Sequence, residues 1–169
     1  MPATGQADPA PLLSLLGREF EAFRQFYQIL ESEQAALIDS DVGRLMTLAQ
    51  QKNDKAAELT QLGEARSALV RAATGLDNPL AMNAWLKRYD ADGRLGAAKR
   101  WEALLDLARR AKALNETNGL VINTRLAHNE QALSILMGAN ASSTRIYGRD
   151  GQAYGSTPSG SSGRPLGKA

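Results

Sequence analysis

The stretch LLSLLGREFEAFRQFYQILESEQAALID, residues 12–39, decides the fold class. Large apolar side chains recur in it at spacings of three and four, the periodicity of an amphipathic helix. They are Leu13, Leu16, Phe20, Phe23, Tyr27, Leu30 and Leu37. No proline interrupts the stretch. We therefore predict a helix of about seven turns, roughly 40 Å long at 1.5 Å per residue.

The following segment predicts an antiparallel partner for this helix. The run Asp39–Gly43 breaks the pattern and supplies N-cap residue types, with acidic charge where a helix start favours it. Leucines then resume the ladder, with Lys52, Lys55 and Arg66 at some of its positions, and Gly75 stands where a left-handed C-cap is needed. Two helices joined by a short link form a hairpin. The basic positions indicate a seam that is only partly covered, or one lined by long aliphatic stems.

Two more helices are expected in the rest of the chain. Asn78-Pro79 supplies an N-cap and a first helical residue, which predicts a short helix from Pro79 to Tyr89. No proline occurs from Ala97 to Met137, and an apolar stripe runs through that segment, so we expect one long helix. Its helix propensity is weakest at residues 115–119, where the helix can bend. Two helices separated at Gly119 are the alternative.

The two ends of the chain differ in composition from its middle. Residues 1–11 contain three prolines and no periodicity. Residues 139–169 are rich in Gly, Ser, Thr, Asn and Pro, and cannot bury enough apolar surface to offset the entropy of ordering. We expect a flexible lead (1–11), a helical domain (12–138) and a flexible tail (139–169). The predicted fold is all-α: a long antiparallel hairpin, a short helix and a long C-terminal helix in a coiled-coil-like bundle.

Composition and charge exclude several classes of function. The chain has no cysteine, so disulfides, a thiolate nucleophile and cysteine-ligated metals are excluded. No stretch of 18 apolar residues and no basic-then-apolar start occurs, which favours a soluble cytoplasmic protein without membrane insertion. Residues 138–169 hold four basic residues and one acidic residue, which leaves 16 basic and 17 acidic residues in the remainder. That near-neutral body argues against a nucleic-acid-binding protein.

The residues that could carry chemistry lack partners at useful spacings. His128 is the single histidine, with no second histidine or orienting carboxylate one helical turn away. The pairs Glu31 with Glu33 and Asp39 with Asp41 are two residues apart, so their side chains point apart on a helix. No phosphate-binding glycine loop precedes a helix. We therefore expect no catalytic, cofactor or metal site, and a binding protein in place of an enzyme.

The most unusual helical stretch is LNETNGLVINTRLAHNEQALSILM, residues 114–137. Its three-and-four ladder mixes apolar side chains with Asn and Gly, which predicts a surface for another helix. The candidate partner-binding residues are Leu114, Asn115, Asn118, Gly119, Ile122, Leu126, Asn129, Leu133 and Leu136. Asn in a helical seam can instead set the register within the chain, and Gly can admit a close neighbour. Both interpretations stay open at this level.

Three motifs resemble one protein family. Residues 114–122 read LNxxNGLVI, residues 129–136 read NEQALxxL, and residues 147–152 read YGxDGQ. Together with the N-terminal helical pattern, they make residues 12 to about 152 similar to the FlgN family of flagellar type III export chaperones.

The resemblance implies a cytoplasmic chaperone without catalysis or cofactor. Its implied cargo is the C-terminal amphipathic helical segments of the hook–filament junction (hook-associated) proteins, held unassembled until export. The stripe from Leu114 to Leu136 would bind the cargo. Tyr147 would dock on the cytoplasmic domain of the export gate. The alternative is a structural coiled-coil adaptor that self-associates through the same stripe, as a homo-oligomer.

Overall fold

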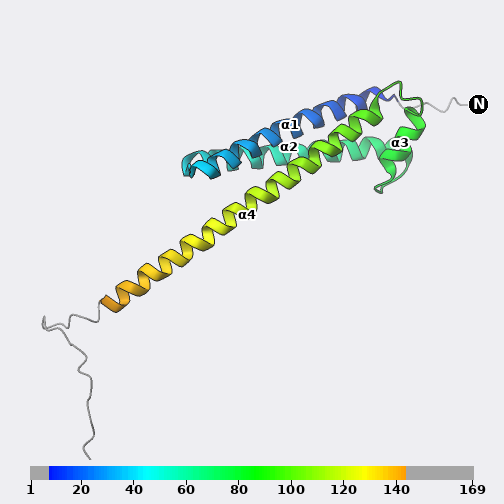
Figure 1. Cartoon of the computed structure of the whole chain (residues 1–169). Coiled ribbons are helices and arrows are strands. Elements are labelled where there is room, and N and C mark those ends of the chain that lie inside the picture. Colours follow the sequence, from blue (N-terminus) through cyan, green and yellow to red (C-terminus); the bar gives the residue numbers. More distant parts are fainter. Residues whose placement is uncertain (1–7, 144–169) are drawn as a thin grey trace, which may run out of the picture. The chain divides into compact units, whose positions relative to one another are not determined.

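The computed structural model describes residues 8–143, the last five through their backbone only. These residues form four helices and no strand: α1 (Ala10–Asp39), α2 (Val42–Thr74), α3 (Ala81–Tyr89) and α4 (Ala97–Ser143), shown in Figure 1. The predicted all-α class is confirmed. The chain divides into two units within α4, after Asn123.

A short reversal joins α1 to α2, as predicted. Ser40 adopts a left-handed conformation with φ 58°. The Asp41 N–H donates to the carbonyl of Ala36 at 3.0 Å, which satisfies an orphan carbonyl at the end of α1. The Asp41 carboxylate accepts a hydrogen bond from the backbone N–H of Arg44 at 3.0 Å and caps α2. Local hydrogen bonds thus define the end of α1 and the start of α2.

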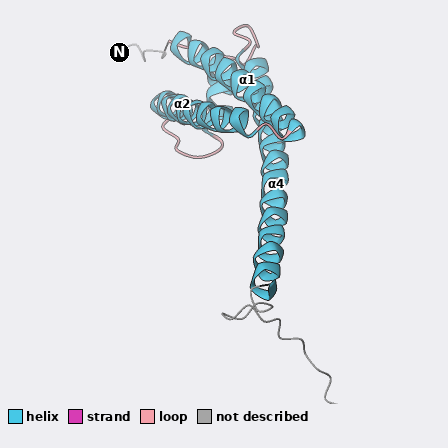
Figure 2. Ribbon diagram, turned by 90° about the vertical axis from the view of Figure 1, so that its left-hand side faces the viewer, coloured by secondary structure: helices cyan, strands magenta, loops and turns pink. Residues whose placement is uncertain are grey.

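Ion pairs cross the seam between α1 and α2, which lie side by side in Figures 1 and 2. Glu33 pairs with Lys52 at 2.6 Å, and Glu19 pairs with Arg66 at 2.8 Å. The residue numbers rise along one helix as they fall along the other, which is the register of an antiparallel hairpin. Both carboxylates are buried. Two of the basic positions seen in the sequence of α2, Lys52 and Arg66, are therefore partners for buried acids on α1. Lys55 instead pairs with Glu58 of its own helix.

The open end of the hairpin holds the main apolar core, which packs α3 and the start of α4 against α1 and α2. Its buried members are Leu12, Leu16, Val70, Ala81, Met82, Trp85, Ala97 and Leu104. α3 begins at Ala81, two residues later than predicted. The cause is Asn78, whose Oδ1 accepts the Leu80 N–H at 2.9 Å and holds the intervening Pro79 in a turn.

Asp90 caps the start of α4, although it lies seven residues before the helix begins. Its Oδ1 accepts the Leu95 N–H at 2.8 Å, and its Oδ2 accepts the N–H groups of Ala97 at 2.8 Å and Ala98 at 3.2 Å. Burial by itself would raise the pKa of this carboxyl, but the backbone N–H donors together hold the pKa below its ordinary value. The carboxylate therefore serves as a capping anion for the longest helix.

α4 is one helix that runs without interruption through Gly119. The alternative of two helices separated at Gly119 is wrong. The helix also continues to Ser143, beyond the predicted end at Met137. No helix within residues 8–143 combines the length and apolarity needed to cross a bilayer. The predicted flexible lead and tail fall largely on residues 1–7 and 144–169, outside the described residues, and remain predictions.

Candidate partner-binding surface

A single ladder of side chains runs along α4, with steps of three or four residues. In the first unit it is covered: Leu104, Leu107 and Ala111 are buried. The candidate residues Leu114 and Ile122 are half-buried and flank Asn118, which is also buried. This half of the predicted stripe therefore faces the chain's own hairpin.

Asn118 is the polar centre of that covered half. It is 1% exposed, and its amide nitrogen donates to the Leu30 carbonyl and to Glu33 Oε2, both at 2.9 Å. The other oxygen of Glu33 accepts from Lys52. One chain of contacts thus ties α4 to α1 and α2. This geometry favours the register-setting role for Asn118, with its amide nitrogen directed inward.

The Asn118 side chain is also incompletely satisfied. Its Oδ1 is buried and has no hydrogen-bond partner. A buried polar atom without a partner costs about 1–3 kcal/mol. The two bonds made by the amide nitrogen must offset that cost for α4 to stay docked on the hairpin.

Asn115 and Gly119 are less buried than Asn118, although they lie within one turn of it. The Asn115 side chain is exposed, and Gly119 is half-buried. A Cβ added at Gly119 would meet nothing within 4 Å. The packing of the described chain therefore does not require glycine at this position.

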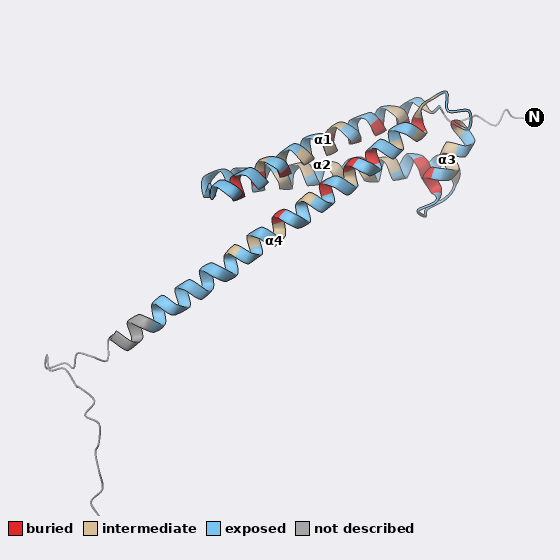
Figure 3. Cartoon of the chain, in the orientation of Figure 1, coloured by how far each residue is buried: buried red, intermediate tan, exposed pale blue. Residues whose placement is uncertain are grey.

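The second unit presents the rest of the ladder uncovered. The candidates Leu126, Asn129, Leu133 and Leu136 are all exposed, and Leu126, the most covered of the three leucines, is still 54% exposed. Figure 3 shows this half of α4 as exposed along nearly its whole described length. A helix with an apolar ladder and no cover has the pattern of a surface that binds another helix.

Two further apolar side chains, not assigned from the sequence, lie on this half of the helix. Met137 is 73% exposed and stands one turn after Leu133, on the face of the ladder. The i, i+4 spacing could have identified it. Ile135 is also exposed, but two residues from Leu133 it projects from the other side of the helix. Tyr147, the predicted gate-docking residue, lies outside the described residues.

His128 and Trp85 lie where a surface residue and a core residue are expected. His128 is exposed on α4. Among residues 8–143, no three His, Asp or Glu side chains are arranged to hold a metal ion. Trp85 is buried in the core and stacks on Tyr89 with ring centroids 5.1 Å apart.

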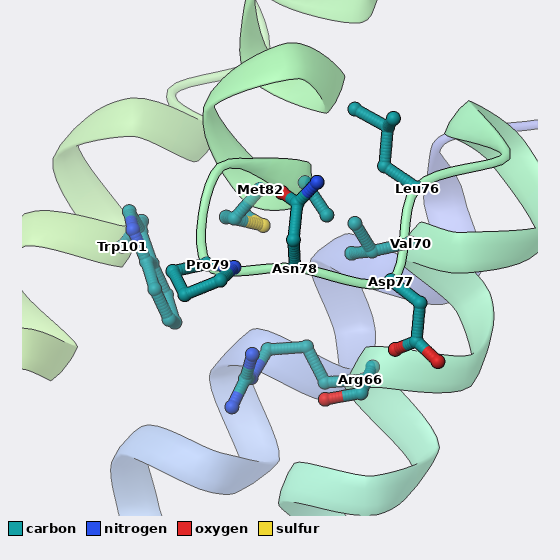
Figure 4. A pocket seen from close by; sticks show the side chains of 10 residues that line it. Arg66, Val70, Leu76, Asp77, Asn78, Pro79, Met82 and Trp101 are labelled. Atoms are coloured by element: carbon teal, nitrogen blue, oxygen red, sulfur yellow. The ribbon is translucent and has the colours of Figure 1, made fainter.

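A pocket of about 430 Å³ lies where the α2–α3 loop meets α2, α3 and α4 (Figure 4). Val70 and Met82 line its apolar side. The Arg66 guanidinium lies 4.8 Å from the centroid of the Trp101 ring and is paired with Glu19. The Ser67 hydroxyl donates to the Gly63 carbonyl at 2.9 Å. Arg66 and Ser67 are thus already engaged within the fold.

Comparison with known proteins adds the decisive observation. The family model described as FlgN protein matches residues 9–155. The chain belongs to the FlgN family. This FlgN-family chain is 31% identical over 134 residues to a flagella synthesis protein FlgN of Proteus mirabilis, covering 78% of this chain and 82% of that protein. It is 38% identical over 60 residues to a flagella synthesis protein FlgN of Yersinia enterocolitica, covering 36% and 40% respectively. No solved structure matches.

Proposed function

We propose that this chain is an export chaperone of flagellar assembly, which binds C-terminal helical segments of hook–filament junction proteins and delivers them to the type III export gate. Membership of the FlgN family supports the assignment to flagellar synthesis, because the matched relatives carry that description. The single observation that carries the binding role is the uncovered apolar ladder of α4 after Asn123.

The ladder leucines of this part of α4 lack the packing that usually stabilises a helix. The described part from Thr124 to Ser143 has twenty residues, and most helical stability in proteins comes from packing of an apolar face. Three ladder leucines, Leu126, Leu133 and Leu136, remain exposed. Full burial of one leucine contributes about 1.5–3 kcal/mol. A cargo helix laid along the ladder supplies that burial and is itself shielded from premature assembly.

The polar members of the ladder suit a complex that must release its cargo. Asn129 lies between Leu126 and Leu133 and reduces the apolar area that a partner can cover. Asn115 and Gly119 are the candidates of the first unit that leave room for an incoming helix, since Asn115 is exposed and a Cβ at Gly119 would have no close neighbours. Asn118 instead holds α4 to the hairpin, so its part in cargo binding is indirect.

The test compares two faces of the same helix. Calorimetry measures binding of a junction protein's C-terminal peptide to Leu126→Ser/Leu133→Ser and to Ile135→Ser. All three side chains are exposed, so neither variant disturbs the core. We expect the double variant to bind at least about tenfold more weakly, since 1.4 kcal/mol corresponds to a factor of ten. We expect Ile135→Ser to bind within about twofold of the parent. Equal binding by all three proteins, with equal helical content, refutes the assignment of the ladder.

We further propose that Tyr147 docks on the cytoplasmic domain of the export gate. The proposal rests on the YGxDGQ motif at residues 147–152, which lies within the match to the family model. Tyr147→Ala should weaken gate binding and leave cargo affinity unchanged, whereas Tyr147→Phe should retain most gate binding if the ring supplies the contact. Loss of both activities, or of neither, argues against a separate docking residue.

The competing function is a structural adaptor that self-associates through the same ladder. Sedimentation of the full chain with and without the cargo peptide separates the two. A chaperone forms a stoichiometric heterocomplex in which cargo replaces any self-association. An adaptor stays oligomeric in the presence of the peptide, and Leu126→Ser/Leu133→Ser makes it monomeric.

A further inference from the structure

A second exposed apolar patch lies at the closed end of the α1–α2 hairpin. It consists of Ile38, Val42 and Met46, which are 74%, 68% and 73% exposed. We call these three residues the hairpin tip. Val42 and Met46 lie one turn apart on α2 and so share a face, and Ile38 lies across the reversal on the last turn of α1. Isolated exposed apolar residues are common, but three large ones gathered around one turn indicate a contact surface.

The hairpin tip is built on firmly held backbone. Ala36 and Leu37, which precede it, are buried, and Leu48, which follows it, is buried as well. The Asp41 cap fixes the start of α2. A patch presented by such a scaffold keeps its shape when free, which lowers the entropy cost of docking a partner.

The charges around the hairpin tip are unbalanced. Residues 38–54 contain Asp39, Asp41 and Asp54, all exposed. The basic side chains of that segment are Arg44 and Lys52, and Lys52 is paired with Glu33 inside the seam. Three carboxylates against one guanidinium give an acidic rim beside an apolar centre. Such a rim attracts basic partners and repels nucleic acid, anionic membrane and an identical hairpin tip.

We propose that the hairpin tip is a second docking surface, separate from the α4 ladder, and that it binds an amphipathic helix of another protein whose apolar face is flanked by Lys or Arg. The apolar face covers Ile38, Val42 and Met46, and the basic flanks face Asp39 and Asp54. Asp41 keeps its capping role at α2. The chain can then hold one partner on α4 and another on the hairpin.

The experiment uses the full chain carrying Leu126→Ser/Leu133→Ser, so that the α4 ladder does not bind the probe. The probes are a synthetic amphipathic helical peptide of leucine and lysine, and a peptide with the same leucine face and glutamate in place of lysine. Fluorescence anisotropy measures their affinities. We expect the lysine peptide to bind at least about tenfold more tightly than the glutamate peptide.

Three variants decide whether that binding is at the hairpin tip. Ile38→Ser/Val42→Ser/Met46→Ser should weaken the lysine peptide at least about tenfold. Asp39→Lys/Asp54→Lys should reverse the preference between the two peptides. The matched control is Leu80→Ser, because Leu80 is 65% exposed at the opposite end of the hairpin, three residues from the exposed Asp77. It should leave both affinities unchanged.

Several results overturn the proposal. They are equal affinities for the two peptides, no loss with the triple variant, or the same loss with Leu80→Ser. A dimer that the triple variant dissociates would identify a second copy as the occupant and would also refute it. If the triple variant does not fold by circular dichroism, Met46→Ser provides the same comparison, because Met46 extends into solvent from a capped helix.

Discussion

Asn118→Ala is the change with the clearest structural consequence. It removes a hydrogen bond to the Glu33 carboxylate and one to the Leu30 carbonyl. A bond to a charged group contributes about 1.5–3 kcal/mol and a neutral one about 1 kcal/mol, while loss of the unpartnered Oδ1 offsets about 1 kcal/mol or more. We expect a net loss of about 1.5–3 kcal/mol in the free energy of unfolding.

Urea unfolding followed by tryptophan fluorescence measures this loss selectively. Trp85 and Trp101, the only two tryptophans, both belong to the unit that contains Asn118. The matched control is Asn115→Ala, which removes an exposed asparagine less than one turn away and should change stability by less than about 0.5 kcal/mol. If the two variants unfold at the same urea concentration, the buried network does not hold α4 to the hairpin.

The remaining predictions concern other single positions. Gly119→Ala should stabilise the chain by up to about 1 kcal/mol in the same urea assay, because alanine is the better helix former and its Cβ meets nothing within 4 Å; a loss of stability would show that the site is closely packed. Glu19→Ala should cost about 3–5 kcal/mol, because it leaves the Arg66 guanidinium without its partner beside a buried site, whereas Glu19→Leu with Arg66→Met should be far less costly. Asp90→Asn should lower the urea midpoint at neutral pH, and its difference from the parent should shrink as the pH falls below the ordinary aspartate pKa. The folded-state pKa of Asp90 is lowered, so its carboxylate stabilises the fold above that range and loses the contribution as it is protonated. If Asp90→Asn lowers the urea midpoint by the same amount at neutral pH and below the ordinary aspartate pKa, the charge of Asp90 does not stabilise the fold.

The helices were predictable because local signals specify them. The Asp39–Gly43 reversal and the Gly75 C-cap are satisfied by bonds within a few residues, so sequence spacing suffices to find them. The late start of α3 was missed, because Asn78 can act as an N-cap or form a turn with the second residue after it, and packing decides between them. The cap from Asp90 was missed because it reaches backbone groups five to eight residues away.

The candidate surface was predictable only in part, for a related reason. Periodicity places Leu126 and Asn118 on one ladder, but it does not show that Asn118 is buried and Leu126 exposed. Asn118 meets Leu30 and Glu33, which are 88 and 85 residues away in the chain, and no local pattern reports such a contact. The buried acids Glu19 and Glu33 were hidden for the same reason: their partners lie on another helix.

The arrangement around Asn118 explains how α4 packs on the hairpin in one defined orientation. A stripe made only of leucine would let α4 slide or rotate on the hairpin, since apolar contacts are not directional. Asn118 accepts only a position in which its amide nitrogen reaches both Leu30 and Glu33, and Lys52 holds Glu33 for it. The polar contact therefore selects which face of α4, within the unit that ends at Asn123, packs on the hairpin.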